Sequence, residues 1–338
     1  MNRRILAVCD SDRDYLNMLH TYFLKKNPAG FEIRIFDSVK RAAEASKEES
    51  FEILLVGEKI YDNNVSGISA QKILILQEDG LSDISGFGAV SKYQSMERLM
   101  GQVLDAFALD EKCVSTESVG RTAASLISFY SPERHKAQSV AALAAAQALS
   151  DMGNRVLYIS MQPFSGFEQI LCTKYEADIT DFLYFVLKHS DKLPYKLEGI
   201  KRTIHGVDYL PPALDYSDLC GITEREWEEC LDMLLHGAGY THIVVDLTET
   251  CRGFYRFLEK SDTVYVLAAQ DALADAMYTQ FAELIRSKDM SAALEKQVRF
   301  NMIKGWESYV SDLSRLSHSP VGVHMKGILG QDGQHYKV

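Results

Sequence analysis

Residues 125–153 read SLISFYSPERHKAQSVAALAAAQALSDMG, and this stretch decides the fold. Its first residues, 125–130, belong to an apolar run from Ala123 to Tyr130, whose length suits a β-strand. After a polar loop, Ser139 to Met152 is predicted to form a long alanine-rich helix, and Gly153 follows where left-handed backbone often ends a helix. A buried strand that leads into an apolar helix favours an α/β domain with a parallel sheet.

The same alternation continues in both directions. Many of the strand patterns are continuous apolar runs, which are typical of strands covered on both faces. On the carboxyl side we expect strands at 156–160, 243–247, 264–268 and 298–303, a short strand within 203–210, and helices at 179–188, 224–235 and 271–288. On the amino side we expect strands at 5–9, 31–36, 51–56, 73–76 and 87–90, and helices at 14–23, 39–47 and 96–109.

The chain has 338 residues, which at roughly 100–200 residues per domain predicts two domains. A polar stretch with several serines and threonines interrupts the pattern after residue 110 and is interpreted as a linker. The predicted organisation is a first domain at 1–110, a linker at 111–121, a second domain at 122–330 and a flexible tail at 331–338. The predicted fold class is α/β, with two tandem doubly wound, mainly parallel sheets.

Charge and composition exclude several classes of protein. With 36 basic and 47 acidic residues the formal charge is −11, which would repel a phosphate backbone, so we expect no nucleic-acid partner. No apolar run reaches the ~20 residues of a membrane span, and no cleavable signal follows Met1. The six cysteines form no CxxC pair and no zinc-spaced set with histidine, so we predict reduced thiols, no metal site and a cytoplasmic protein.

The first domain resembles a response-regulator receiver domain. That family holds Mg²⁺ with carboxylates after the first strand, phosphorylates an aspartate after the third and pairs the phosphate with a lysine after the fifth. Asp10 and Asp12 follow the first strand, Gly57 stands at the phosphoacceptor position and Lys92 follows the fifth strand. Glycine cannot form an acyl phosphate, so the resemblance implies a pseudo-receiver. Its charged residues either are solvated in loops or line a vestigial pocket.

The second domain resembles the MinD/ParA group of P-loop ATPases. That group has Lys-Gly-Gly-x-Gly-Lys-Thr-Thr between strand and helix, because glycines admit the phosphates, lysine neutralises them and threonine binds Mg²⁺. Here Glu133 takes the place of the first lysine, Gln138 that of the central lysine, and Ser139 keeps a hydroxyl. No glycine occurs anywhere from residue 121 to residue 152, so side chains should obstruct a phosphate chain.

The other nucleotide motifs of that group are also altered. Ser160-Met161-Gln162 replaces Asp-x-Asp, whereas Asp246 keeps the acidic position of the Walker B strand. Asn301 either reads adenine or forms a turn, and the basic residues 134–136 either hold an anion loosely or form a solvated loop. The degenerate nucleotide site is predicted to comprise Ser131, Arg134, Lys136, Gln138, Ser139, Asp246 and Asn301.

Over nearly the whole chain, the order of these elements resembles the TadZ/CpaE proteins of type IVb (Flp, Tad) pilus assembly, which join an atypical receiver to a MinD-like domain. The resemblance implies a non-catalytic localisation or scaffold factor. It would act as a homodimer that recruits secretion components, such as a motor ATPase, to the inner-membrane face or the cell pole. The alternative is a switch that binds ATP with Mg²⁺ through Ser139 and Asp246 without hydrolysing it. An enzyme with a repurposed basic pocket is a third option, but no acid–base set accompanies it.

Overall fold

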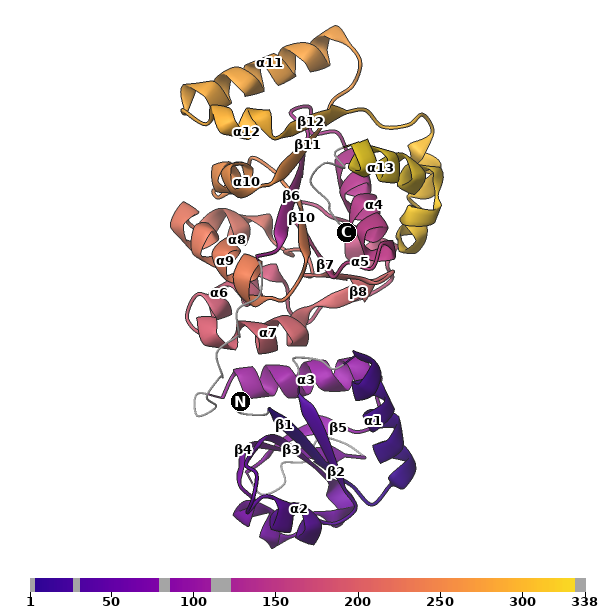
Figure 1. Ribbon diagram of the computed structural model, residues 1–338, viewed down its shortest axis with the longest axis vertical. Helices are drawn as coiled ribbons and strands as arrows, with labels where there is room; N and C mark the ends of the chain where they lie inside the picture. Colours follow the sequence, from indigo (N-terminus) through magenta and orange to yellow (C-terminus); the bar gives the residue numbers. More distant parts are fainter. Residues whose placement is uncertain (1–3, 27–30, 79–85, 111–122, 332–338) are drawn as a thin grey trace. The chain divides into compact units, whose positions relative to one another are not determined.

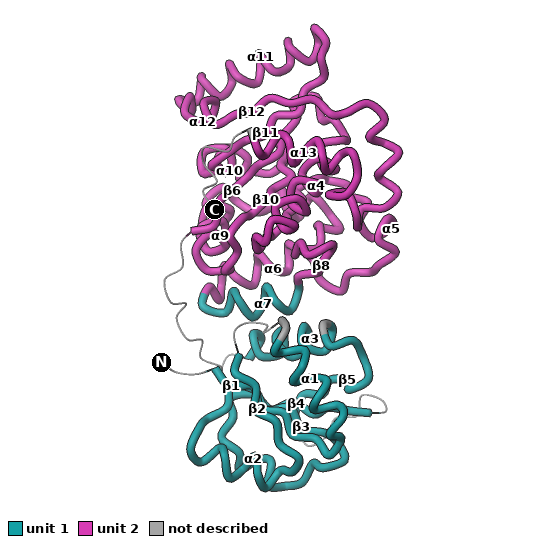
Figure 2. Tube along the Cα trace, turned by 45° about the vertical axis from the view of Figure 1, so that its right-hand side comes forward, with its two compact units in different colours: residues 1–117, 191–200 teal, residues 118–190, 201–338 magenta. Residues whose placement is uncertain are grey.

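The computed structural model describes residues 4–26, 31–78, 86–110 and 123–331 (Figure 1). The chain divides into two compact units, one made of residues 1–117 with 191–200 and the other of residues 118–190 with 201–338 (Figure 2). The predicted linker, 111–121, lies outside the described residues. Each unit is described by itself below.

The first unit is a parallel sheet with the strand order β2-β1-β3-β4-β5. The strands are β1 (Ile5–Cys9), β2 (Glu32–Phe36), β3 (Phe51–Gly57), β4 (Ala70–Gln77) and β5 (Gly88–Ser91). The helices are α1 (Arg13–Lys26), α2 (Val39–Ala45) and α3 (Met96–Ala108), with the short turns η2 (Glu58–Ile60) and η3 (Asn63–Gly67). Helices cover both faces of this sheet, α2 on one side and α1 with α3 on the other (Figure 1). This explains why β1 is apolar throughout and why β3 is apolar except at Glu52.

A segment distant in sequence completes the first unit. Residues 191–200 include most of η4 (Ser190–Lys192) and all of α7 (Leu193–Ile200), and α7 packs on α3 (Figure 2). The ring of Tyr195 is buried, with its centroid 4.9 Å from that of Phe107 and 5.9 Å from that of Phe31. Lys196 Nζ donates to Asp105 Oδ1 at 2.7 Å. This segment lies inside the range that the sequence assigns to the second domain, and its pattern predicted no element there.

The second unit is a larger sheet in the order β12-β11-β6-β10-β7-β9-β8, parallel except for the pair β8–β9. The strands are β6 (Ser125–Tyr130), β7 (Val156–Ser160), β8 (Arg202–Ile204), β9 (Val207–Tyr209), β10 (His242–Asp246), β11 (Thr263–Leu267) and β12 (Gln297–Phe300). The single short strand expected within 203–210 is instead a hairpin, because residues 205 and 206 both adopt left-handed backbone and reverse the chain.

Helix α4 (Ala137–Asp151) is the central helix of this unit. All its residues from Ala137 to Leu149 except Ser139 are buried, because the sheet lies on one side and α13 (Pro320–Gln331) and η6 (Leu313–His318) on the other. The remaining elements are α5 (Phe167–Ile170), α6 (Ile179–Val186), α8 (Tyr216–Gly221), α9 (Glu224–Gly237), α10 (Phe254–Lys260), α11 (Ala272–Ser287), α12 (Ser291–Glu295) and η5 (Trp306–Tyr309).

The predicted tail begins one residue too early, since Gln331 still belongs to α13, and residues 332–338 lie outside the described part. Within the described ranges, none of the helices has both the length and the apolar character needed to cross a bilayer.

The packing of α7 on α3 gives a first prediction. Tyr195→Ala should remove a ring that lies between two phenylalanines and should cost about 3 kcal/mol or more of local stability. Hydrogen exchange measured by mass spectrometry should then show faster exchange in both α3 and α7. Tyr184→Ala is the control, because that ring is 49% exposed on α6. Unchanged protection of α3 in Tyr195→Ala would contradict the packing.

Candidate functional site

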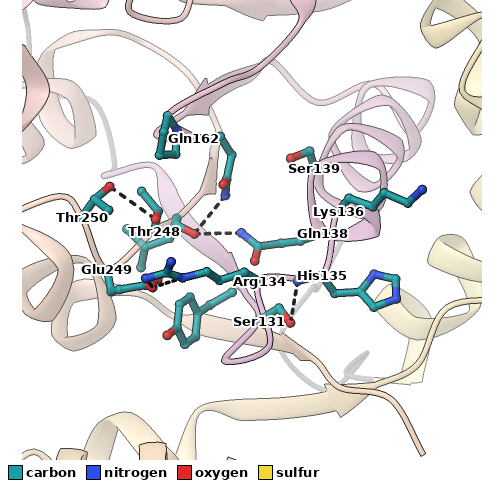
Figure 3. Close-up of a pocket in the computed structure, with 13 residues that line it drawn as sticks. Ser131, Arg134, His135, Lys136, Gln138, Ser139, Gln162, Thr248, Glu249 and Thr250 are labelled. Carbon is teal, nitrogen blue, oxygen red and sulfur yellow. Dashed lines mark hydrogen bonds and ion pairs between the residues drawn. The ribbon is translucent and has the colours of Figure 1, made fainter. Parts of the chain in front are cut away.

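The carboxyl ends of three neighbouring parallel strands, β6, β10 and β7, surround a small cavity in the second unit (Figure 3). Its volume is about 110 Å³. The loop between β6 and α4 supplies one wall, and the segments that follow β7 and β10 supply the others. The lining residues are Tyr130, Ser131, Arg134, His135, Lys136, Gln138, Ser139, Gln162, Pro163, Leu247, Thr248, Glu249 and Thr250.

Gln138 occupies the position of the central lysine and points inward from the first turn of α4. Its side chain is buried, and Nε2 lies 3.0 Å from the carbonyl oxygen of Phe129, 2.8 Å from that of Leu247 and 2.6 Å from Asp246 Oδ1. The amide group is therefore held by the ends of β6 and β10. It closes the inner end of the cavity instead of extending toward a bound anion.

Asp246 lies behind this amide at the end of β10 and is fully buried. Gln162 Nε2 donates to its Oδ1 at 2.9 Å, and the Tyr158 hydroxyl donates to its Oδ2 at 3.3 Å. Burial raises the pKa of the Asp246 carboxyl above its usual range, although hydrogen bonds from Ser139, Gln162, Gln138 and Tyr158 oppose that effect. Figure 3 shows the side chains of Gln138 and Gln162 pointing toward one oxygen, the Leu247 carbonyl, to which both donate.

The basic loop residues are also engaged within the fold. Arg134, whose φ is 53°, donates from Nε to Glu249 Oε1 at 2.5 Å across the cavity. The Lys136 ammonium lies 5.5 Å from the centre of the Trp306 ring and points away from Gln138 (Figure 3). Glu133 Oε1 accepts a hydrogen bond from the backbone N–H of Ala269 at 2.7 Å. The side chains of Arg134 and Lys136 nevertheless remain exposed to solvent, Arg134 at 75%, so each is a solvated residue that also has one partner in the fold.

The remaining predicted residues divide between the cavity and the surface. Ser131 and Ser139 line the cavity, and Ser131 Oγ accepts from the backbone N–H of His135 at 3.3 Å. Asn301 does not line it; its side chain is exposed, and its backbone oxygen lies 2.8 Å from His324 Nε2. The sequence analysis missed three partners, Tyr158, Glu249 and Trp306. Only Glu249 carries a signal, as an acidic residue directly after the Walker B strand.

These residues do not fit a nucleoside triphosphate with its Mg²⁺. Pockets for small molecules usually begin at about 300 Å³, well above the volume of this cavity. The Gln138 amide is bonded to the ends of β6 and β10, and Arg134 and Glu249, which both line the cavity, are paired with each other. No hydrolytic step follows from this geometry.

The pocket of the first unit is closed in a similar way. Lys92 Nζ lies 2.9 Å from Asp10 Oδ2, and both side chains are almost completely buried. A Cβ built on Gly57 would lie 2.5 Å from that same oxygen, so the Asp10 carboxylate fills the space of a phosphoacceptor side chain. Burial lowers the pKa of Lys92, but its hydrogen bonds to Asp10 and Glu78 outweigh burial, and the pKa is raised.

Asp12 belongs to this pocket only at its edge. Its side chain is solvent-exposed, and its Oδ2 lies 3.9 Å from Lys92 Nζ. Glu78, which directly follows β4, lies closer, with Oε1 3.3 Å from Lys92 Nζ. Hydrogen bonds from the backbone, chiefly that of Tyr15, lower the pKa of Asp12. Glu78 was not among the residues predicted from the sequence. The vestigial-pocket interpretation therefore describes Asp10 and Lys92, and the solvated-loop interpretation describes Asp12.

Comparison with solved structures shows several similarities, each covering a little under two thirds of this chain. The ParA-family ATPase from Chlorobium tepidum matches with 14% identity and a TM-score of 0.49, over 63% of this chain and 98% of that one. Cobyrinic acid a,c-diamide synthase from Mycobacterium smegmatis, with bound ATP analogue and magnesium, matches with 15% identity and a TM-score of 0.42. This match covers 64% of this chain and 84% of the synthase chain. A chain of the MinC:MinD complex of Aquifex aeolicus matches with 14% identity and a TM-score of 0.41. This match covers 62% of this chain and 89% of that one.

These similarities concern the ParA/MinD type of fold and assign no activity, ligand or partner to this chain. No protein-family model matches the sequence. No curated protein matches it either.

The buried pair of Asp10 and Lys92 beside Gly57 gives a second prediction. Gly57→Ala should destabilise the protein by about 1–3 kcal/mol, because the new methyl group would overlap the Asp10 carboxylate. Gly67→Ala is the matched control, since a Cβ there would meet nothing within 4 Å. Urea unfolding curves followed by circular dichroism compare the two variants. Equal stability would mean that Asp10 does not fill this space.

The buried Asp246 carboxyl gives a third prediction. The pKa of Asp246 is higher in the folded state than the ordinary value of 3.8 that it has in the unfolded chain. The protonated Asp246 therefore stabilises the fold fully below pH 3.8, and this stabilisation is lost as the pH rises through the pKa of the folded state. Asp246→Asn keeps the shape and an oxygen for both glutamines, but it cannot ionise. The stability of this variant relative to the wild type should therefore increase from pH 4 to pH 7, as measured by urea unfolding.

Asp215→Asn is the control with the opposite sign. Hydrogen bonds from Ser217 lower the pKa of Asp215, so its stabilising effect is present above pH 3.8 and lost as the pH falls through the folded pKa. The Asn variant should therefore lose stability relative to the wild type as the pH rises. A stability difference for Asp246→Asn that is the same at every pH would show that Asp246 has no raised pKa.

Proposed function

We propose that this chain is a non-catalytic scaffold and localisation factor for assembly of a type IVb (Flp, Tad) pilus. It acts as a homodimer that recruits secretion components, such as a motor ATPase, at the inner-membrane face. The observation that carries the proposal is the inward-pointing Gln138 amide, which occupies the phosphate end of the nucleotide site. The Asp10 carboxylate does the same at the phosphoacceptor position of the first unit.

The resemblance to the TadZ/CpaE proteins supplies the biological setting. In both units the fold is kept while the catalytic position is filled by a side chain of the protein itself. What the two units can still provide is surface for binding other proteins. Hydrolysis of a phosphoanhydride needs charge stabilisation around the transferred group, and neither the lysine nor the glycine amides are present to supply it.

An exposed apolar patch beside the cavity is the surface we assign to the homodimer. It comprises Phe164, Leu214 and Tyr216, of which the first two are 87% and 86% exposed. The rings of Phe164 and Tyr216 lie 6.0 Å apart, and Pro163, next to Phe164, lines the cavity. Large apolar side chains that gather on a surface usually mark an interaction site. In this position the patch supports a dimer formed across the carboxyl ends of the strands.

A second candidate function is the nucleotide-gated switch. The observation that favours it is the nearness of the Ser139 hydroxyl to the Asp246 carboxyl, which opposes the rise in the pKa of Asp246. A hydroxyl next to an acidic residue is the pair that binds Mg²⁺ in P-loop proteins. In this alternative, MgATP would displace Gln138 and promote dimer formation.

Light scattering coupled to size-exclusion chromatography should separate the two functions, and this is the fourth prediction. The scaffold should be a dimer without nucleotide, and MgATP should change neither its mass nor its melting temperature. The double variant Phe164→Ser/Leu214→Ser should weaken the dimer at least tenfold. Leu273→Ser is the control, because that side chain is 70% exposed on a different element, α11.

A dimer that forms only with MgATP would overturn the scaffold and support the switch. The pilus setting is tested separately, by capture of partners from native lysate with the wild type and the Phe164→Ser/Leu214→Ser variant. Recovery of a pilus motor ATPase or another secretion component by the wild type supports that setting. Capture of no such component would contradict it even if the dimer were constitutive.

A further inference from the structure

Two histidines and one aspartate meet at the end of α4 that is distant from the cavity. Asp151 is the last residue of α4, His205 lies in the turn between β8 and β9, and His318 is the last residue of η6. One ligand atom from each lies within 4.8 Å of the other two. Because α4 has 15 residues and each adds 1.5 Å, this cluster is about 20 Å from the cavity. It therefore does not belong to the degenerate nucleotide site.

The backbone around the cluster is held in place from several sides. Gln147 lies one turn before Asp151 on α4; its Nε2 donates to the Leu313 oxygen at 2.7 Å, and its Oε1 accepts from the Ser317 N–H at 3.0 Å. These bonds attach η6 to α4. His205 and Gly206 form a tight two-residue hairpin turn with φ values of 46° and 75°. The three side chains thus come from elements with fixed positions relative to one another.

The distances suit a tetrahedral ion. His205 Nε2 lies 3.3 Å from Asp151 Oδ1, close to the ~3.4 Å edge of a tetrahedron with metal–ligand bonds of about 2.1 Å. The rings of His205 and His318 lie 5.0 Å apart at an angle of 83°. Ser317 Oγ is 3.1 Å from His318 Nδ1, and a hydroxyl bonded to one ring nitrogen leaves the other available to a metal.

We propose that Asp151, His205 and His318 bind a divalent transition-metal ion of the zinc type, with water at the fourth position. Imidazole nitrogen and carboxylate oxygen are ligands that such ions prefer. The ion would connect the end of α4, the β8–β9 turn and η6, and it would stabilise their packing. The sequence analysis predicted no metal site because the three ligands are separated by more than fifty residues.

Lys326 makes the site selective in a testable way. Its ammonium lies 3.1 Å from Asp151 Oδ2, the carboxylate oxygen that does not face His205. The Lys326 side chain is 36% exposed and can move into solvent when a cation binds. Because its positive charge competes with the metal, Lys326→Met should bind zinc more tightly than the wild type.

The fifth prediction uses zinc as the probe on the full chain, reduced and stripped with a chelator. Titration against a chromophoric chelator should show one tight equivalent, and zinc should raise the melting temperature. His205→Asn and His318→Gln should each weaken binding at least tenfold. Asn is chosen because it favours the left-handed turn at residue 205. His236→Ala, which changes an exposed histidine on α9, should bind as the wild type does.

Cysteine thiolates are the competing ligands, since Cys172 is exposed. A Cys172→Ser variant that keeps full zinc binding supports the histidine site. Several outcomes would overturn the proposal: no tight equivalent in the wild type, unchanged binding in the double variant His205→Asn/His318→Gln, or no gain in affinity for Lys326→Met. Melting temperatures measured without zinc show whether each variant is folded, so a loss of binding can be separated from unfolding.

Discussion

The structure depends on how a carboxylate is accommodated at the carboxyl ends of buried parallel strands. Asp10 lies just after β1 in one unit and Asp246 ends β10 in the other, and both are almost fully buried. Removing a carboxylate from water costs several kcal/mol unless hydrogen bonds or an opposite charge compensate. Here the chain supplies the compensation itself.

The two units solve the problem differently. In the first, the Lys92 ammonium meets the Asp10 carboxylate, and Gly57 leaves room for that pair. In the second, the described part of the chain places no cation beside Asp246, and the neutral side chains of Gln138, Gln162 and Tyr158 donate hydrogen bonds to it. An ion pair keeps both groups charged, whereas neutral donors leave a buried charge only partly compensated. Burial therefore raises the pKa of Asp246 despite these hydrogen bonds.

Much of the fold could be predicted because its strands are continuous apolar runs. The segment 51–56 and the segment 243–247 can hardly form anything else in an alternating α/β pattern. The assignment of 191–200 to the first unit could not be predicted, since it depends on the contact of Tyr195 with two distant rings. The β8–β9 hairpin was missed because histidine is an unusual first residue for such a turn.

The candidate site could be predicted in position but not in orientation. The sequence placed residues 138, 139 and 246 around one strand end, where the structure has them. It could not show that Gln138 turns inward, because that depends on the three oxygens of Phe129, Asp246 and Leu247. Asn301 was predicted from its place after a strand, but β12 is the edge strand of the sheet and Asn301 lies away from the cavity.

The choice of glutamine at position 138 follows from the same constraint. A lysine there, without phosphate, would bury a second charge beside Asp246, and removing that charge from water would cost several kcal/mol that its attraction to the carboxylate would have to offset. Glutamine gives the Phe129, Asp246 and Leu247 oxygens a donor at the cost of burying only a neutral amide. Such a residue is favourable only where no phosphate has to be neutralised. Gln138 and the absence of glycine from residues 121–152 are therefore consistent with each other, since both belong to a loop that is closed by its own side chains.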